Sequence, residues 1–424
     1  MRLPLAIALL SWPSFALQPL NAFVTSALDR NPDVLEAKAN ALQQGAQADL
    51  ALGHVLPGIA ARGSYTRNQY DSILDLTAFG AGVTTIVPLN QWDAAATVTV
   101  PLIDAAGWAR TSAAKTSAQS ADLQLAAARL AMEAQVAQDY YQLVANLAVA
   151  AAARQALDAS QENLRLTRNR VEAGVAQGLD ADRAVADVEA QNQQVSNAEL
   201  QVLLAARALE STSGLAPDAS QVVALADDLH AEPPLPSFED AFERLPSVAA
   251  SAAGTEAADE QARAQRFSLL PSLSGSFAEH GTTASGFVGH DWTWQAVLAL
   301  SWNLDLTSFA GIRSQDAAAD AARAREQRTR LAAHDAIYRE WQSVAAGIAR
   351  SRSARAGQAA AAHAAQQARD RYEAGTVVQL DLLQAQRDAF AAEVARIQAD
   401  ADLINARAQL RLAAGHPLTE RSLQ

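Results

Sequence analysis

The 424-residue sequence contains no cysteine, and only 5% of its residues are aromatic. The absence of cysteine excludes disulfides, thiolate metal sites and a lipid-modified N-terminal cysteine. Hydrophobic residues nevertheless make up 50% of the chain, and alanine and leucine dominate. This composition is typical of long helices rather than of a bulky mixed core.

Basic residues are also few. The chain has 33 Lys and Arg against 46 Asp and Glu, a formal net charge of −13. Nucleic-acid binding requires clustered Lys and Arg that neutralise phosphates, so we expect no nucleic-acid partner.

Long apolar runs are missing as well. No stretch reaches about 18 consecutive apolar residues, so no transmembrane helix is predicted. The N-terminus combines Met1-Arg2 with the apolar run Leu3–Leu10 and the small-x-small site Ser14–Ala16. This pattern predicts a signal peptide over residues 1–16 and an exported mature chain that starts at Leu17.

No residue constellation predicts catalysis. The seven histidines are scattered without a pair at helical spacing, so no metal site is expected. No Gly-rich phosphate loop and no Gly-x-Ser-x-Gly elbow is present. We therefore expect neither an enzyme nor a cofactor. Paired acids such as Asp227-Asp228 are interpreted as solvated.

The chain carries a long internal repeat. Arg168-x-Arg170-x-Glu172-Ala173-Gly174 recurs, 201 residues later, as Arg369-x-Arg371-x-Glu373-Ala374-Gly375. Leu209 and Gly214 recur at the same offset as Leu410 and Gly415, and Asp104 recurs as Asp305. The chain is therefore two fused copies of one unit, residues 17–215 and 246–424, joined by a Pro-rich linker over residues 216–245.

Each copy predicts a helix, two strands, a long helix and a shorter return helix. In the first copy the strands span about 57–67 and 91–103, the long helix 104–173 and the return helix 180–213. In the second copy they span about 271–279, 291–304, 305–374 and 381–414. The strand containing Trp92 is one residue out of register with the offset, so we expect a small insertion between Val100 and Asp104.

The strands alternate apolar and polar residues over about ten positions, as transmembrane β-strands do. Alternation alone fits an ordinary two-hairpin sheet with one wet face equally well. In the membrane interpretation, the aromatic residues of the strands lie at the membrane interface: Tyr65, Trp92, Phe277, Trp292, Trp294 and Trp302.

The long helices imply partner chains. About seventy residues without proline give a rod on the order of 100 Å, and its small residues bury little area. Four transmembrane strands cannot close, because barrels need about eight or more. Three chains would supply twelve strands with no free edge, so a homotrimer is expected.

On these features the sequence resembles the TolC-like outer-membrane factors of tripartite efflux pumps and type I secretion systems. The most specific segment is Tyr372-Glu-Ala-Gly375-x₄-Leu380-Asp381-Leu-Leu-x-Ala385-Gln386. The resemblance implies a mainly α protein with transmembrane β: each copy supplies a strand hairpin and a long helical hairpin. It also implies a trimer that forms a 12-strand β-barrel in the outer membrane of a Gram-negative bacterium, continuous with an α-helical periplasmic tunnel.

The resemblance also implies two sites. An entrance gate would use Asp180, Tyr372 and Asp381, with Gln384 where some relatives have a second aspartate and Val377 where some have an arginine. Asp180 and Asp381 fit helix N-capping equally well, with Gln384 completing a capping-box-like pair with Asp381. The hairpin tips would dock an adaptor through Arg170, Glu172, Gly174, Arg371, Glu373 and Gly375.

The function implied by the resemblance is a passive gated conduit for small molecules such as drugs, metals or solvents. Its expected partners are a periplasmic adaptor, an inner-membrane transporter (a proton-driven pump or an ABC ATPase) and outer-membrane lipid. One alternative is a type I protein or peptide secretion duct. Another is an exported coiled-coil scaffold without a channel, which leaves the duplicated amphipathic strands unexplained.

Overall fold

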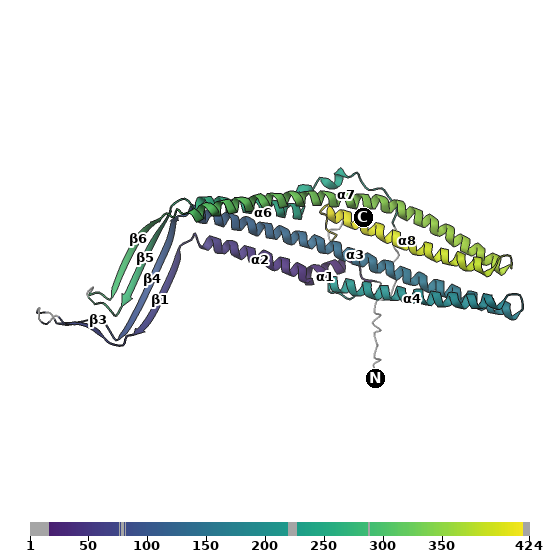
Figure 1. Ribbon diagram of the computed structural model, residues 1–424, viewed down its shortest axis with the longest axis horizontal. Coiled ribbons are helices and arrows are strands. Elements are labelled where there is room, and N and C mark those ends of the chain that lie inside the picture. The colour runs from purple at the N-terminus through teal and green to yellow at the C-terminus, as the bar shows by residue number, and fades with distance from the viewer. Residues whose placement is uncertain are drawn as a thin grey trace, which may run out of the picture. The chain divides into compact units, whose positions relative to one another are not determined.

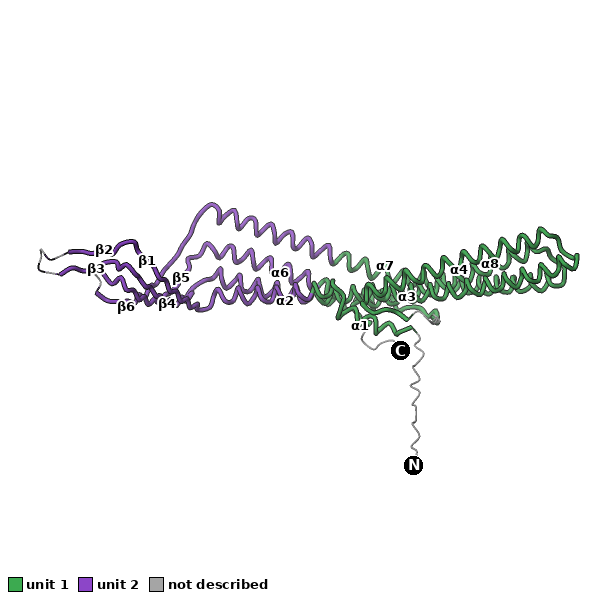
Figure 2. Tube along the Cα trace, turned by 90° about the horizontal axis from the view of Figure 1, so that it is seen from below, with its two compact units in different colours: residues 1–37, 125–248, 330–424 green, residues 38–124, 249–329 purple. Residues whose placement is uncertain are grey.

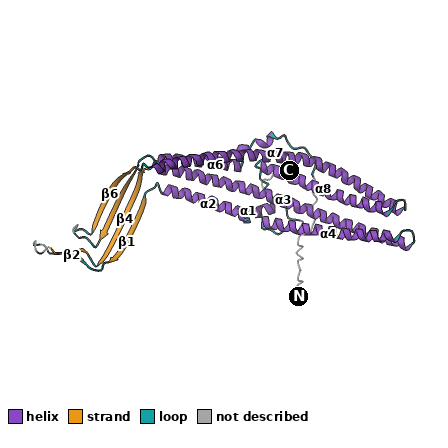
Figure 3. Ribbon diagram, in the orientation of Figure 1, coloured by secondary structure: helices purple, strands orange, loops and turns teal. Residues whose placement is uncertain are grey.

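The computed structural model describes residues 17–75, 77, 80, 82–218, 227–286 and 289–418. The predicted signal peptide lies outside these residues. Figures 1 and 3 show the helices and strands. In chain order they are α1 (Leu20–Arg30), α2 (Pro32–Gly53), β1 (Gly58–Arg67), β2 (Ser72–Asp75), β3 (Val83–Val87), β4 (Asn90–Ile103), α3 (Ala105–Glu172), α4 (Gly178–Ser213), α5 (Pro236–Glu239), the 3₁₀ helix η2 (Phe242–Arg244), α6 (Pro246–Phe267), β5 (Ser272–Thr282), β6 (Trp292–Ser301), α7 (Leu306–Glu373) and α8 (Gln379–Ala413).

The chain folds into two compact units, and each unit combines segments of both repeats (Figure 2). Unit 1 comprises residues 1–37, 125–248 and 330–424; unit 2 comprises residues 38–124 and 249–329. All described strands belong to unit 2, whereas α1, α4, α5 and α8 belong to unit 1.

In unit 2, β1, β4, β5 and β6 form one antiparallel sheet in that order. Residues that pair across an antiparallel sheet share a face, so the register assigns each side chain to a face. The apolar face carries Ile59, Tyr65, Trp92, Val98, Val100, Phe277, Trp292, Trp294, Leu298 and Leu300. The opposite face carries Arg62, Ser64, Gln91, Asp93, Thr97, Thr99, Ser274, Ser276, His280, Thr293 and Gln295.

A β-bulge interrupts β4 near its end. Pro101 pairs with Ser274 and Ile103 pairs with Leu273, which leaves Leu102 between them without a partner on β5. A bulge adds one residue to one strand of a pair. The bulge does not explain the one-residue shift between the copies, because Trp92 and Asp104 are 12 positions apart whereas Trp292 and Asp305 are 13 apart. The insertion predicted between Val100 and Asp104 is therefore wrong: the first copy is the shorter one at this point.

A second hairpin, β2–β3, lies between β1 and β4 and was not predicted from the sequence. Its strands have 4 and 5 residues, too few to show a clear alternation. The strand predicted over 291–304 ends at Ser301 instead. Beyond it, Asp305 accepts a hydrogen bond from the Ser308 amide at 2.7 Å and caps α7. Asp104 caps α3 in the same way, through the Gly107 amide at 2.7 Å.

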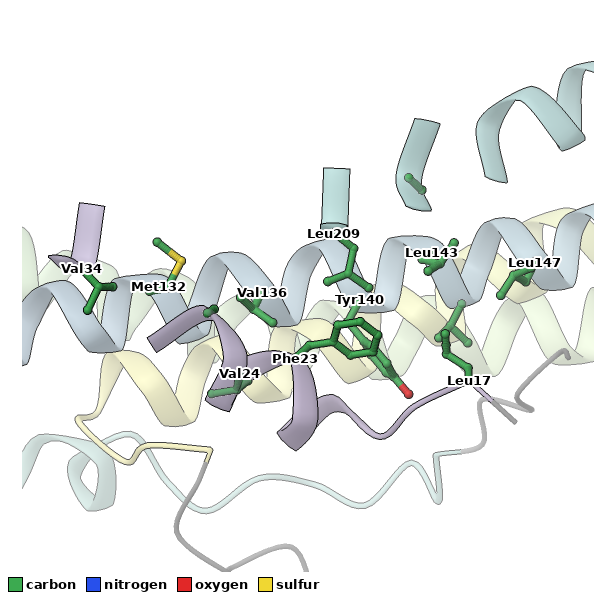
Figure 4. Close-up of a cluster of buried hydrophobic side chains, with 13 residues drawn as sticks. Leu17, Phe23, Val24, Val34, Met132, Val136, Tyr140, Leu143, Leu147 and Leu209 are labelled. Carbon is green, nitrogen blue, oxygen red and sulfur yellow. The ribbon is translucent and has the colours of Figure 1, made fainter. Parts of the chain in front are cut away.

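The apolar core of unit 1 forms where α1 packs against α3 and α4. Phe23 and Val24 of α1 are fully buried beside Val136, Tyr140 and Leu209 (Figure 4). Burial raises the pKa of the Tyr140 hydroxyl. A second cluster joins the end of the linker to α7 and α8 through Leu245, Val248, Ile337, Val344, Leu403 and Leu410.

The linker is fixed to α8 by a buried ion pair. The Arg407 guanidinium lies 2.8 Å from the Asp227 carboxylate and also contacts Glu232. Only 8% of the Asp227 side chain is exposed, so the interpretation of this residue as solvated is wrong; the buried Arg407 requires a counter-charge. Asp228 does face solvent, with 75% of its side chain exposed.

The helices of unit 2 contact one another through small and polar residues. The Ser120 hydroxyl donates to the Ala250 carbonyl at 2.8 Å, and Glu260 accepts hydrogen bonds from Ser112 and Thr116. Across the described segments, no helix has an apolar stretch sufficient for membrane crossing.

Candidate functional site

The two helical hairpins, α3–α4 and α7–α8, end in matching turns within unit 1. Gly174 and Gly375 adopt left-handed conformations, with φ of 73° and 76°. The Val175 amide donates to the Arg170 carbonyl, and the Thr376 amide donates to the Arg371 carbonyl, each at 2.9 Å. These six-to-one bonds close both long helices in the manner that C-terminal glycine permits.

Tyr372, a predicted gate residue, joins the two hairpins. Its hydroxyl lies 3.1 Å from Thr167 Oγ1, and its side chain is buried. Arg170 stacks over the Tyr372 ring at 4.8 Å and donates a hydrogen bond to its carbonyl oxygen. Gln379 donates to Thr167 at 3.5 Å. Arg170, which the sequence assigned to a docking tip, therefore contacts the tyrosine instead of only projecting outward.

A second link between the hairpins was missed by sequence reasoning. Arg387 of α8 donates two hydrogen bonds to Asp187 Oδ1 of α4, at 2.9 and 3.1 Å. The Asp187 side chain is only 4% exposed, whereas that of Arg387 is 53% exposed. Asp187 lies on the buried stripe of α4 that contains Ala184 and Gln191. A charge on such a stripe requires a partner, and that signal could have found the pair.

Asp180 and Asp381 occupy equivalent third positions of α4 and α8, not the N-cap positions. The N-cap residues are Gln177 and Val378. Asp180 accepts a hydrogen bond from the Gln177 amide at 3.4 Å as part of a capping box. Asp381 is exposed, and its side chain makes no hydrogen bond or ion pair within the described chain.

The suggested capping pair between Gln384 and Asp381 is wrong. Gln384 donates along the helix to Asp388 at 2.9 Å, because an i, i+4 partner is within reach on the same face. Asp381 therefore remains an exposed carboxylate in the first turn of α8.

The remaining tip residues present charge and apolar surface. Glu373 pairs with Arg369 at 3.2 Å, whereas Glu172 and Arg371 are exposed. The pKa of the nearby Glu162 carboxyl is lowered because Arg165 donates hydrogen bonds to it. Each tip also exposes two apolar side chains that sequence reasoning did not single out: Val175 and Leu179 in one, and Val378 and Leu380 in the other.

The aromatic residues predicted for the membrane interface gather on the apolar face of the sheet. Tyr65 and Trp92 contact across β1 and β4, with ring centroids 4.8 Å apart. Phe277 and Trp294 stack across β5 and β6 at 6.1 Å, and Trp292 shares their face. Trp302 lies just past β6, where its indole nitrogen donates to the Leu269 carbonyl at 3.0 Å.

Known proteins match most of this chain. A family model described as outer membrane efflux protein matches residues 23–215 and 238–416. The antibiotic efflux pump outer membrane protein ArpC of Pseudomonas putida is 27% identical over 270 residues, which cover 62% of this chain and 54% of ArpC. The chain thus spans about half the length of this relative. Outer membrane protein OprJ of Pseudomonas aeruginosa is 29% identical over 425 residues, 92% of this chain and 83% of OprJ.

The fold matches solved structures as well. The outer membrane channel CmeC of Campylobacter jejuni superimposes with a TM-score of 0.80 at 18% identity, covering 100% of this chain and 95% of that one. At this identity the similarity concerns the fold: long helical hairpins joined to short strand hairpins.

Proposed function

The chain belongs to the outer membrane efflux protein family and is an outer-membrane protein of Gram-negative bacteria; on this premise we propose that it is the outer-membrane duct of a tripartite export system. In this role it is a passive, gated conduit for small molecules and catalyses no reaction of its own. The energy for transport comes from its partners.

The observation that carries the proposal is the four-stranded sheet. It has one apolar and one polar face, and its outer strands β1 and β6 pair with only one described neighbour each. Leu298, Leu300 and Trp294 of β6 are each at least 70% exposed. Exposure of such apolar side chains costs free energy in water but not in lipid. Pairing of β6 with β1 of the next copy, three times, closes a twelve-strand barrel with lipid outside and a polar lumen inside.

We assign the entrance gate to the ends of the hairpins. The Tyr372–Thr167 and Arg387–Asp187 contacts hold α7–α8 against α3–α4 within a protomer. These contacts stabilise the closed arrangement. Asp381, exposed in the first turn of α8, supplies negative charge at the constriction, whereas Asp180 combines a capping role with a place near the entrance.

The tips are the docking surface for a periplasmic adaptor. Val175, Leu179, Val378 and Leu380 offer apolar contacts, and Glu172 and Arg371 offer charged contacts beside the glycine turns. An inner-membrane transporter completes the system. The name of the Pseudomonas putida relative supports antibiotics and similar small organic molecules as cargo.

Gel mobility of the outer-membrane fraction tests the proposal. Unheated in SDS, the protein should migrate near the mass of three chains and collapse to one chain on boiling. Cells that lack the protein but retain the adaptor and pump should become more susceptible to exported antibiotics. A monomer in the soluble periplasmic fraction would contradict the duct and favour the scaffold without a channel.

A further inference from the structure

Buried amide groups without hydrogen-bond partners gather where the two helical hairpins meet. Gln191, Gln379 and Gln386 each bury an unpartnered Oε1 atom, and neither side-chain polar atom of Asn163 has a partner. Elsewhere in the described chain only Ser26 Oγ and Arg407 Nε share this state, and Arg407 is covered by its ion pair with Asp227. Buried polar groups in proteins are almost always satisfied by protein or by ordered water.

Two adjoining cavities lie beside three of these amides, those of Asn163, Gln191 and Gln386. The larger, about 270 Å³, is lined by all four helices, including Asp187 and Gln191 of α4 and Gln386 and Phe390 of α8. The smaller, about 10 Å³, is lined by Asn163, Tyr372 and Gln386. Ala159, Arg369 and Gln386 line both cavities, so the two adjoin.

The cavities have the size and polarity that water requires. A cavity needs about 10–15 Å³ of such space to hold one water, so the smaller cavity fits about one and the larger fits several. The unpartnered Gln191 and Gln386 oxygens are acceptors in need of donors, and Gln191 is only 8% exposed. Water supplies donors in any geometry, whereas a dry cavity would leave these oxygens desolvated.

Farther from the tips, the hairpins meet through apolar packing and through the Gln409 amide, which donates to the Ala134 carbonyl at 2.8 Å. Ala145 and Ala152 of α3 pack directly on Ile397 and Ala401 of α8 in a purely apolar cluster. Nearer the tips, apolar packing gives way to the amide-lined cavities and to the Asp187–Arg387 pair that borders them.

We propose that these cavities bind a cluster of ordered water, which hydrates the seam between the α3–α4 and α7–α8 hairpins and allows them to separate. The side chains of a hydrated seam contact water both before and after the hairpins separate, so opening exposes little new apolar surface. This inference rests on the proposed gated duct, whereas the presence of water can be tested without transport.

Radiolytic hydroxyl-radical labelling of the intact, full-length protein reads the water directly. Phe390, which is half-buried beside the larger cavity, should be modified several-fold faster than Phe23, which is fully buried in a dry core. The double variant Gln191→Leu/Gln386→Leu should reduce Phe390 labelling by more than half. The control Gln193→Leu/Gln194→Leu replaces two exposed glutamines of α4, the helix that carries Gln191, and should leave Phe390 labelling unchanged. Phe390 labelling as slow as that of Phe23, or equal in all three proteins, would overturn the proposal.

Channel recordings then test the consequence. In planar bilayers the Gln191→Leu/Gln386→Leu protein should open several-fold less often than wild type, while its heat-sensitive trimer band persists. Unchanged opening in a protein that has lost the Phe390 signal would refute the role of water in opening. Absence of the heat-sensitive trimer band in wild type would instead contradict the proposed duct. The labelling result would still test the presence of water, because it does not depend on the trimer.

Discussion

Replacing Arg387 by alanine removes the only ion-pair partner that the described chain offers to Asp187. The Asp187 side chain is 4% exposed and accepts both guanidinium hydrogen bonds on one oxygen. Breaking a buried pair costs about 3–5 kcal/mol, because a desolvated charge remains. Arg387 is 53% exposed, so we take the lower end, about 3 kcal/mol.

In the gate proposed above, this loss of free energy destabilises the closed arrangement, in which the two hairpins contact each other. At 1.36 kcal/mol per factor of ten, about 3 kcal/mol shifts the closed-to-open ratio by up to roughly 150-fold per protomer. We expect Arg387→Ala to raise the open probability of single channels in planar bilayers and to sensitise cells to vancomycin, which is too large for general porins.

Two controls isolate the cause. Asp187→Ala/Arg387→Ala should be less leaky than Arg387→Ala, because no unpaired carboxylate remains to be buried. Arg207→Ala removes an exposed i, i+3 pair with Glu210 on the same helix as Asp187 and should change little. If the double variant leaks as much as Arg387→Ala, or if Arg387→Ala conducts like wild type, the Asp187–Arg387 pair does not hold the channel closed.

Other predictions use the same structure. Tyr372→Phe should cost about 0.5–1.5 kcal/mol of closed-state stability, because the hydrogen bond to Thr167 is lost. Tyr372→Ala should leak more, because it also removes the ring that Arg170 stacks on. Equal leakage of the two variants would show that this ring does not stabilise the closed state. Asp381→Ala should raise channel conductance if this exposed carboxylate narrows the entrance, and an unchanged conductance would leave it only a favourable first-turn charge. Trp294→Arg should weaken the heat-sensitive trimer by up to about 1 kcal/mol, the cost of an arginine on the lipid face near the membrane interface. The adjacent Gln295→Arg should not weaken it, because the two residues face opposite sides of the sheet; equal effects would contradict the assigned faces.

Much of the architecture can be predicted from the sequence because it is written twice. The long helices lack proline, their glycine turns recur at one offset, and the strands alternate. The Leu102 bulge could not be predicted in this way, because the one-residue shift makes the first copy shorter, not longer, between Trp92 and Asp104. The β2–β3 hairpin could not be predicted, because its strands are too short to establish a period and no second copy supports them.

The contacts of the candidate site were harder to predict. Asp187 and Arg387 lie 200 residues apart and are not equivalent positions of the two copies, so neither spacing nor repetition links them. Asp227 was misassigned for the same reason, since its partner Arg407 comes from the far end of the chain. Periodicity identifies which face of a helix is buried, but it does not identify the partner of a charge on that face.

The unequal edges of the sheet have a genetic consequence. β1 comes from the first repeat and β6 from the second. In the proposed trimer every junction between chains therefore joins unlike halves, and a defect in one edge disrupts one junction only. In a ring of three, one such junction is enough to prevent closure. A cell that makes intact and edge-defective chains in equal amounts would assemble only about one wholly intact ring in eight. Defects in β1 or β6 should therefore be dominant over an intact gene copy. A gene copy that makes no chain at all should only reduce the number of ducts, because the remaining chains are all intact.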